Sequence, residues 1–255
     1  MRKLLYMLAF ALALPAQAAD GDGNLTVLAD PSLLLPLAEL SRDYAKQSGT
    51  PLAFMVEDSE HAAGQIEQGL DAHLLLTANQ PLLESLKERG LADVFHSHPF
   101  ARTQLALVGS SSIEPRTDFA RHISLAAILY AQADLPVYVT PESSYEGSRA
   151  AALLKQKTFA ELLSKRVTPV ASREEAIRRL HAAPGLALLL ATDALNDPSL
   201  KVLYVFGDEA TAPVNYQAVT LASGRMAEAD KFIQYLESRP GQQIFARFGF
   251  QPPKP

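Results

Sequence analysis

The chain alternates between short apolar runs and longer segments in which apolar residues recur every three or four positions. Short, almost unbroken apolar runs are typical of strands covered on both faces, and the longer period is typical of amphipathic helices. In the first part of the chain this pattern predicts strands at 25–29, 52–56 and 73–76 and helices at 31–47, 59–68 and 81–89. This strand-helix order predicts right-handed crossovers and an α/β lobe with a mainly parallel sheet.

A second series of the same kind surrounds the polar stretch 109–112. It predicts strands at 104–108, 137–140, 167–170 and 186–190, with helices at 147–155 and 173–182. The segment 216–221 is predicted to return as a strand, and 226–248 to supply two terminal helices. The pattern therefore predicts two α/β lobes. Residues 19–105 and 216–255 form the first, which is discontinuous in sequence, and residues 106–215 form the second.

The first 18 residues have the features of a cleaved signal peptide. Arg2 and Lys3 are basic, residues 4–14 are apolar but too few to span a bilayer, and Ala16-Gln17-Ala18 fits an A-x-A cleavage site. No cysteine follows that would take a lipid. We therefore expect a periplasmic protein that begins near Ala19. An uncleaved anchor is the alternative, but no stop-transfer pattern follows the apolar run.

Composition excludes several classes of function. The 255 residues hold 23 basic and 28 acidic side chains, and loss of the leader with its Arg2 and Lys3 takes the net charge from −5 to −7. An acidic chain is not attracted to nucleic acid or to anionic lipid. The absence of cysteine excludes disulfides and thiolate chemistry. No nucleophile elbow, phosphate loop, dinucleotide fingerprint or His-Glu-x-x-His motif occurs, so we predict no enzyme, no cofactor and no resident metal.

A cleft between two such lobes places the ends of strands opposite one another, where ligands of α/β sheets bind. Asp30-Pro31-Ser32 follows the first strand, and Asp58-Ser59 follows the second. Both serines would lie in the first turn of a helix, where unpaired N–H groups and the helix dipole attract an anion. The alternative is that Asp30, and Asp58 or Ser59, only cap their helices.

Three segments resemble periplasmic solute-binding proteins of ABC transporters, and the molybdate-binding family in particular. Ser238-Arg239-Pro240-Gly241-Gln242 with the terminal Gly249-Phe250 matches the C-terminal signature, and Ser32-Leu33 and Gln65-Ile66-Glu67-Gln68-Gly69 match the regions of the two first-lobe loops. The resemblance implies the two-lobed type II periplasmic binding fold, with a ligand cleft between the lobes. It also implies a monomer that binds an oxyanion of the molybdate or tungstate class and delivers it to an inner-membrane permease.

The same resemblance assigns site residues. Ser32 and Ser59 take the places of the ligand serines, and Glu146 and Arg173 stand where the family offers backbone N–H groups, with Ser172 as the alternative to Arg173. Leu190 replaces the ligand tyrosine, which removes one hydroxyl donor.

Charged side chains around the predicted cleft distinguish this chain from the family. Asp30 and Asp58 would add negative charge to the first-lobe rim, and Arg149 and Arg173 positive charge to the second lobe, although each arginine is also a common solvated residue at a helix start. We hypothesise that the arginines face the carboxylates and either close the cleft by salt bridges or accept a ligand that carries both charges. The alternatives to an oxyanion carrier are a pocket rebuilt for an organic anion or zwitterion, and a periplasmic sensor or interaction module without a transport role.

Overall fold

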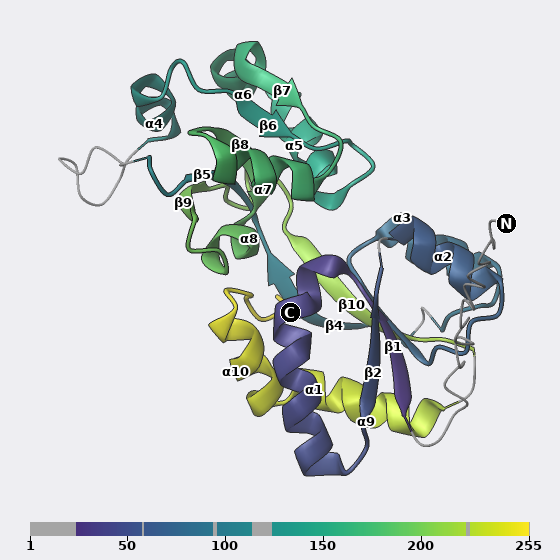
Figure 1. Ribbon diagram of the computed structural model, residues 1–255. Coiled ribbons are helices and arrows are strands. Elements are labelled where there is room, and N and C mark those ends of the chain that lie inside the picture. The colour runs from purple at the N-terminus through teal and green to yellow at the C-terminus, as the bar shows by residue number, and fades with distance from the viewer. Residues whose placement is uncertain (1–23, 58, 94–95, 114–123, 223–224, 255) are drawn as a thin grey trace, which may run out of the picture.

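The computed structural model describes residues 24–57, 59–93, 96–113, 124–222 and 225–254. They form two lobes, each built on a five-stranded sheet (Figure 1). The strands of lobe I are β1 (Leu25–Ala29), β2 (Leu52–Val56), β3 (Leu74–Thr77), β4 (His98–Thr103) and β10 (Val214–Thr220). Those of lobe II are β5 (Leu105–Ser110), β6 (Val137–Val139), β7 (Val167–Pro169), β8 (Leu186–Leu190) and β9 (Leu200–Val205).

Both sheets have the same arrangement of strands. The order is β2-β1-β3-β10-β4 in lobe I and β7-β6-β8-β5-β9 in lobe II. In lobe I, β1 pairs in parallel with β2 and β3, and β10 runs antiparallel between β3 and β4. In lobe II, β6 pairs in parallel with β7 and β8, and β5 runs antiparallel between β8 and β9. Each sheet is thus mainly parallel with one reversed strand, and the predicted two-lobed α/β fold is confirmed.

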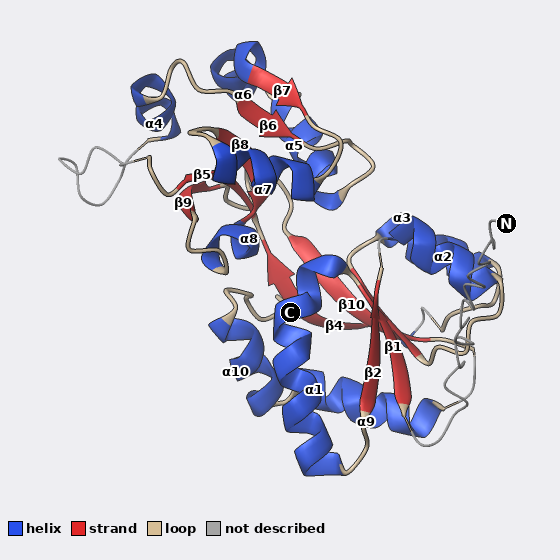
Figure 2. Cartoon of the chain, viewed as in Figure 1, coloured by secondary structure: helices blue, strands red, loops and turns tan. Residues whose placement is uncertain are grey.

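Helices cover both faces of each sheet (Figure 2). In lobe I, α1 (Leu34–Ser48), α9 (Met226–Glu237) and α10 (Arg239–Arg247) pack on one face, and α2 (Ser59–Glu67) and α3 (Gln80–Glu88) on the other. In lobe II, α4 (Leu125–Ala131), α5 (Tyr145–Leu154) and α6 (Lys157–Leu163) cover one face, and α7 (Arg173–Ala182) and α8 (Ala191–Leu195) the other. Every residue of β3 and β8 is buried, which explains why both strands read as unbroken apolar runs.

The chain crosses between the lobes twice, at neighbouring positions. Gln104 alone separates β4 from β5, and residues 206–213 lead from β9 back to β10. Val214 pairs with Thr103 on one side of the junction, and Ala106 pairs with Val205 on the other. The Gln104 amide also donates to Asp208 at 2.9 Å, which ties the two crossing segments together. The returning strand β10 begins at Val214, two residues before the boundary expected from the sequence.

Two sequence expectations concern the leader and a resident metal. The leader, residues 1–18, lies outside the described residues. Among the residues that are described, no helix is both long and apolar enough to span a bilayer. No group of three or more metal-ligating side chains occurs in the described part of the chain.

Candidate functional site

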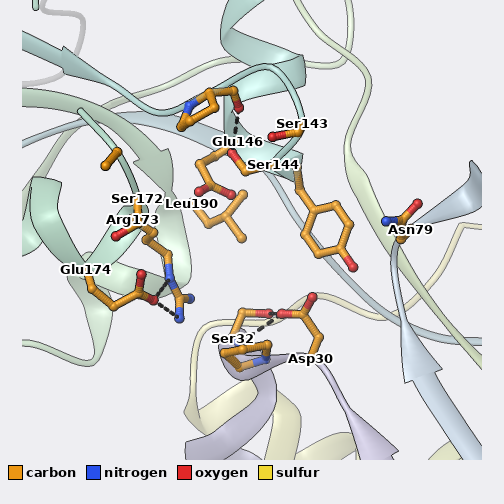
Figure 3. A pocket seen from close by; sticks show the side chains of 14 residues that line it. Asp30, Ser32, Asn79, Ser143, Ser144, Glu146, Ser172, Arg173, Glu174 and Leu190 are labelled. Carbon is orange, nitrogen blue, oxygen red and sulfur yellow. Dashed lines mark hydrogen bonds and ion pairs between the residues drawn. The ribbon is translucent and has the colours of Figure 1, made fainter. Parts of the chain in front are cut away.

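A cavity of about 420 Å³ lies between the lobes, and it is lined by the loops that follow five strands. Asp30, Pro31 and Ser32 follow β1, and Asn79 follows β3. From lobe II, residues 141 and 143–146 follow β6, residues 171–174 follow β7, and Leu190 ends β8. The cavity therefore opens at the carboxyl ends of the strands, and its volume is typical of a small-molecule site, roughly 300–1,000 Å³. Figure 3 shows the side chains that line it.

The lobe I side of the cavity is built on Asp30 and Ser32. Asp30 is 9% exposed, and its Oδ1 accepts from the backbone N–H of Ser32 at 2.9 Å and from the Ser32 hydroxyl at 2.5 Å. The Ser32 hydroxyl is also 2.7 Å from the hydroxyl of Tyr216. Because burial and the nearby Asp30 raise the pKa of Tyr216 well above its usual range, this phenol keeps its proton. The three side chains form a hydrogen-bonded chain from the core to the cavity.

Arg173 provides the positive charge on the lobe II side. Its Nη1 donates to Asp193 at 3.1 Å, and its Nε and Nη2 donate to Glu174 at 3.3 and 3.2 Å. Asp193 is itself fixed by the backbone N–H of Leu190, which donates to its second oxygen at 3.1 Å. Burial alone would lower the pKa of Arg173, but Asp193 and Glu174 outweigh that effect and raise it. The guanidinium is therefore charged and held in place.

Glu146 is the most buried of the acidic groups that line the cavity. It is 4% exposed, and its carboxyl group points into the cavity beside Leu190 (Figure 3). Burial raises the pKa of Glu146, and the charge of Asp193 raises it further, whereas Arg173 and Ser144 act in the opposite direction. A protonated Glu146 carboxyl can donate as well as accept a hydrogen bond.

The loop that carries Glu146 is fixed by a helix cap and by close backbone packing. The Ser144 hydroxyl accepts from the N–H of Gly147 at 3.1 Å and caps α5. A Cβ atom on Gly147 would lie 1.9 Å from the carbonyl oxygen of Pro141, so the chain passes closer here than a side chain would allow. These contacts hold residues 143–146 against the cavity.

One hydrogen bond joins the lobes beside the cavity. The hydroxyl of Tyr145, at the start of α5, lies 2.8 Å from the hydroxyl of Thr77 at the end of β3. Thr77 also accepts from the N–H of Asn79 at 3.0 Å. Tyr145 thus connects a cavity loop of lobe II with one of lobe I.

The structure brings together most of the residues that the sequence singled out. Ser32, Glu146, Arg173 and Asp30 all line the cavity. Ser59 is the first residue of α2, and Asp58 lies outside the described residues. Arg149 is not among the lining residues; its Nη2 donates to the carbonyl oxygen of Pro213 at 3.4 Å.

The hypothesis of salt bridges between the lobes is wrong for Arg173. Its ion pairs among the described residues are with Glu174 and Asp193, which both belong to lobe II. The reason is local, because Glu174 is its neighbour in α7 and Asp193 lies in the first turn of α8 next to the end of β8. Asp30 is hydrogen-bonded to Ser32, as Figure 3 shows, and its charge is among those that raise the pKa of Arg173.

Sequence reasoning missed Asp193, Asn79 and Glu174 as parts of the site. Asp193 carried a usable signal, because an acidic residue three positions after a strand end is typical of the first turn of a helix. Asn79 could also have been predicted, because an asparagine shortly before a proline is typical of a helix start. Its side chain caps α3 by accepting from the N–H of Leu82 at 3.0 Å.

Comparisons with known proteins show the family and the fold that this chain resembles. The family described as bacterial extracellular solute-binding protein matches residues 25–251. The chain is 22% identical over 251 residues to the molybdate-binding protein ModA of Escherichia coli K12, covering 95% of this chain and 94% of the relative. It is 24% identical over 238 residues to ModA of Haemophilus influenzae, covering 90% of each. The solved periplasmic molybdate-binding protein of Azotobacter vinelandii superimposes with a TM-score of 0.71 at 18% identity, covering 90% of this chain and 100% of that chain.

Proposed function

Because the chain belongs to the family of bacterial extracellular solute-binding proteins, we propose that it carries a small solute in the cavity between its lobes. In this proposal the leader directs the chain to the periplasm and is removed there. The monomeric carrier then delivers its cargo to an ABC permease in the inner membrane. Cargo that contacts both lobes favours the closed arrangement, because its affinity for that arrangement is higher.

The observation that carries this proposal is that both lobes contribute residues to the lining of the cavity. Lobe I contributes Asp30, Ser32 and Asn79, and lobe II contributes charged and polar groups from three loops. A ligand that fills the cavity would therefore bind both lobes at once. Among the described residues, no three His, Cys, Asp or Glu side chains are grouped so that they could hold a metal ion.

The first candidate cargo is an oxyanion of the molybdate or tungstate class. The names of the two ModA relatives support it. The anion would accept hydrogen bonds from the first-turn N–H groups of α5 and α7 and from Arg173, and from the Ser32 hydroxyl if that group turned away from Asp30.

The second candidate is a different small ligand, held in a rebuilt cavity. Two features favour it: Asp30 accepts the hydrogen bonds that Ser32 would give to an anion, and Leu190 offers no hydroxyl.

A ligand screen on the ligand-stripped chain without its leader tests the proposal. We would measure thermal unfolding and the radius of gyration with molybdate, tungstate, sulfate, small organic acids and zwitterions. A true cargo at about 100 times its Kd stabilises the fold by about 2.7 kcal/mol, which raises Tm by roughly 5–10 °C for a chain of this size. It also lowers the radius of gyration. If no compound in the panel does either, the carrier function is wrong.

A transport assay separates the carrier from a sensor. Uptake of the identified ligand by cells should fall when the gene is deleted and recover when it is restored. Unchanged uptake, with ligand binding intact in the purified chain, would instead favour a sensor or interaction module.

A further inference from the structure

Resting on the carrier function proposed above, we infer that the cavity selects a small zwitterion whose protonated amine binds Asp30 and whose anionic group binds Arg173. A zwitterion differs in charge from the molybdate for which the relatives are named.

The hydrogen-bond donors of Ser32 are already used by the chain itself. Both the N–H and the hydroxyl of Ser32 donate to Oδ1 of Asp30. Since the Ser32 proton lies on that bond, it is Tyr216 that donates across the 2.7 Å contact to Ser32. An anion at this position would have to displace a carboxylate of the protein. What Asp30 offers to a ligand is an acceptor: both bonds from Ser32 end on its Oδ1, and among the described residues no hydrogen bond or ion pair ends on its Oδ2.

The carboxylate of Asp30 is complementary to a positively charged group with N–H donors. An ammonium group has three N–H bonds and no acceptor, and a charge-assisted bond to a carboxylate is shorter and stronger than a neutral one. Asp30 is mostly buried, so its interaction with a bound cation is weakly screened by solvent.

Lobe II contributes the guanidinium of Arg173, and Glu146 and Glu174 line the same side. The bonds of Arg173 to Asp193 and Glu174 use three of the five guanidinium N–H groups. The first turns of α5 and α7, each ten residues long, border the same space. A carboxylate here accepts from a guanidinium and from first-turn N–H groups, which is an arrangement typical of anion sites.

The total charge argues against a free dianion. Three acidic residues line the cavity, Asp30, Glu146 and Glu174, against one guanidinium. Asp30 and Arg173 form no ion pair with each other in the described part of the chain, although the charge of Asp30 is among those that raise the pKa of Arg173. A zwitterion places each of its charges next to the opposite one and adds no net charge. A dianion brings two negative charges to a site that is already acidic.

Calorimetric titration with matched probes tests this directly. The probes are the L-α-amino acids, each compared with its deaminated acid and its decarboxylated amine, together with molybdate and sulfate. We expect at least one amino acid to bind, and removal of either charged group to weaken binding by at least about 30-fold. This comparison uses the unmodified chain, so it does not depend on the folding of a variant.

A charge-neutral variant gives the second test. Asp30→Asn keeps an oxygen that accepts from Ser32 but removes the negative charge. We expect it to weaken amino-acid binding by at least about 30-fold and to strengthen molybdate binding. The matched control is Asp71→Asn, the same chemical change at a side chain that is 77% exposed and precedes β3 at the far end of the sheet. It should leave both affinities unchanged.

The outcomes distinguish the inference from the function on which it rests. One outcome overturns the zwitterion inference and leaves the carrier function standing. In it, molybdate binds the unmodified chain, no zwitterion binds, and Asp30→Asn does not improve the affinity for molybdate. If no probe binds and none changes the radius of gyration, both fail. Amino-acid binding that is lost in Asp30→Asn and kept in Asp71→Asn supports both.

Discussion

Replacing Gly147 with alanine should destabilise the loop that carries the lobe II side of the cavity. The added Cβ would lie 1.9 Å from the carbonyl oxygen of Pro141, 2.6 Å from its carbonyl carbon and 2.7 Å from the carbonyl oxygen of Thr140. All three are backbone atoms, so no side-chain rotation relieves the contact. The loop after β6 has to move by about 1 Å to reach even a tight contact.

The size of the effect follows from this geometry. Overpacking of a well-packed site costs about 1–3 kcal/mol, and because backbone closes the space around Gly147 we expect the upper end of that range. For a chain of this length such a loss lowers Tm by roughly 6–12 °C. The same movement shifts Tyr145 and Glu146, so ligand affinity should fall as well.

Gly64→Ala is the matched control. Gly64 lies inside α2, and nothing lies within 4 Å of the position that its Cβ would take. Alanine there should stabilise the fold by roughly 0.5–1 kcal/mol because it removes backbone freedom from the unfolded chain. Calorimetric Tm values and urea midpoints of both variants check the pair. If Gly147→Ala is as stable as the original chain, our description of the loop packing is incorrect.

Three further predictions concern single contacts. Burial raises the pKa of Glu146 above its ordinary value of 4.5. The protonated carboxyl therefore contributes stability that is fully present below pH 4.5 and is lost as the pH rises through the raised pKa. Glu146→Gln should therefore be more stable than the original chain at pH 7 but not at pH 4 in urea unfolding, and an equal gain at both pH values would contradict this. Tyr145→Phe removes the bond to Thr77 and about 0.5–1.5 kcal/mol from the contact between the lobes, which should enlarge the radius of gyration and weaken ligand binding; no change in either quantity would argue against the contact. Ser238→Ala removes the cap of α10 and should cost about 1 kcal/mol in thermal unfolding, whereas Ser238→Asn keeps an acceptor, so equal losses would show that the cap is unimportant.

How well the strands could be predicted depended on how continuous their apolar runs are. The bounds of β1, β2 and β8 were predicted to the residue. β1 and β8 have neighbours on both sides, and β2 is an unbroken apolar run although it lies at an edge of its sheet. The edge strands β4 and β9 were not predicted, because polar residues such as His98 and Lys201 interrupt their apolar pattern.

The candidate site was predictable only where its contacts are local. Asp30 as a cap and Ser32 in the first helical turn followed from the order Asp-Pro-Ser after a strand. The contact between Ser32 and Tyr216 joins residues 184 apart, and it exists because β10 inserts next to β3. The pair of Arg173 and Asp193 likewise depends on how α7 and α8 meet at the end of β8. Sequence periodicity contains no information on such pairings.

The insertion of one lobe into the other determines the order in which the chain can fold as it is made. All five strands of lobe II lie between residues 105 and 205, so they are present long before synthesis ends. Lobe I has to wait for β10, because that strand fills the gap between β3 and β4. Until residue 220 has emerged, the edges of β3 and β4 are unpaired and open to association with other chains. During synthesis, lobe I is therefore the part of the protein that is most vulnerable to aggregation.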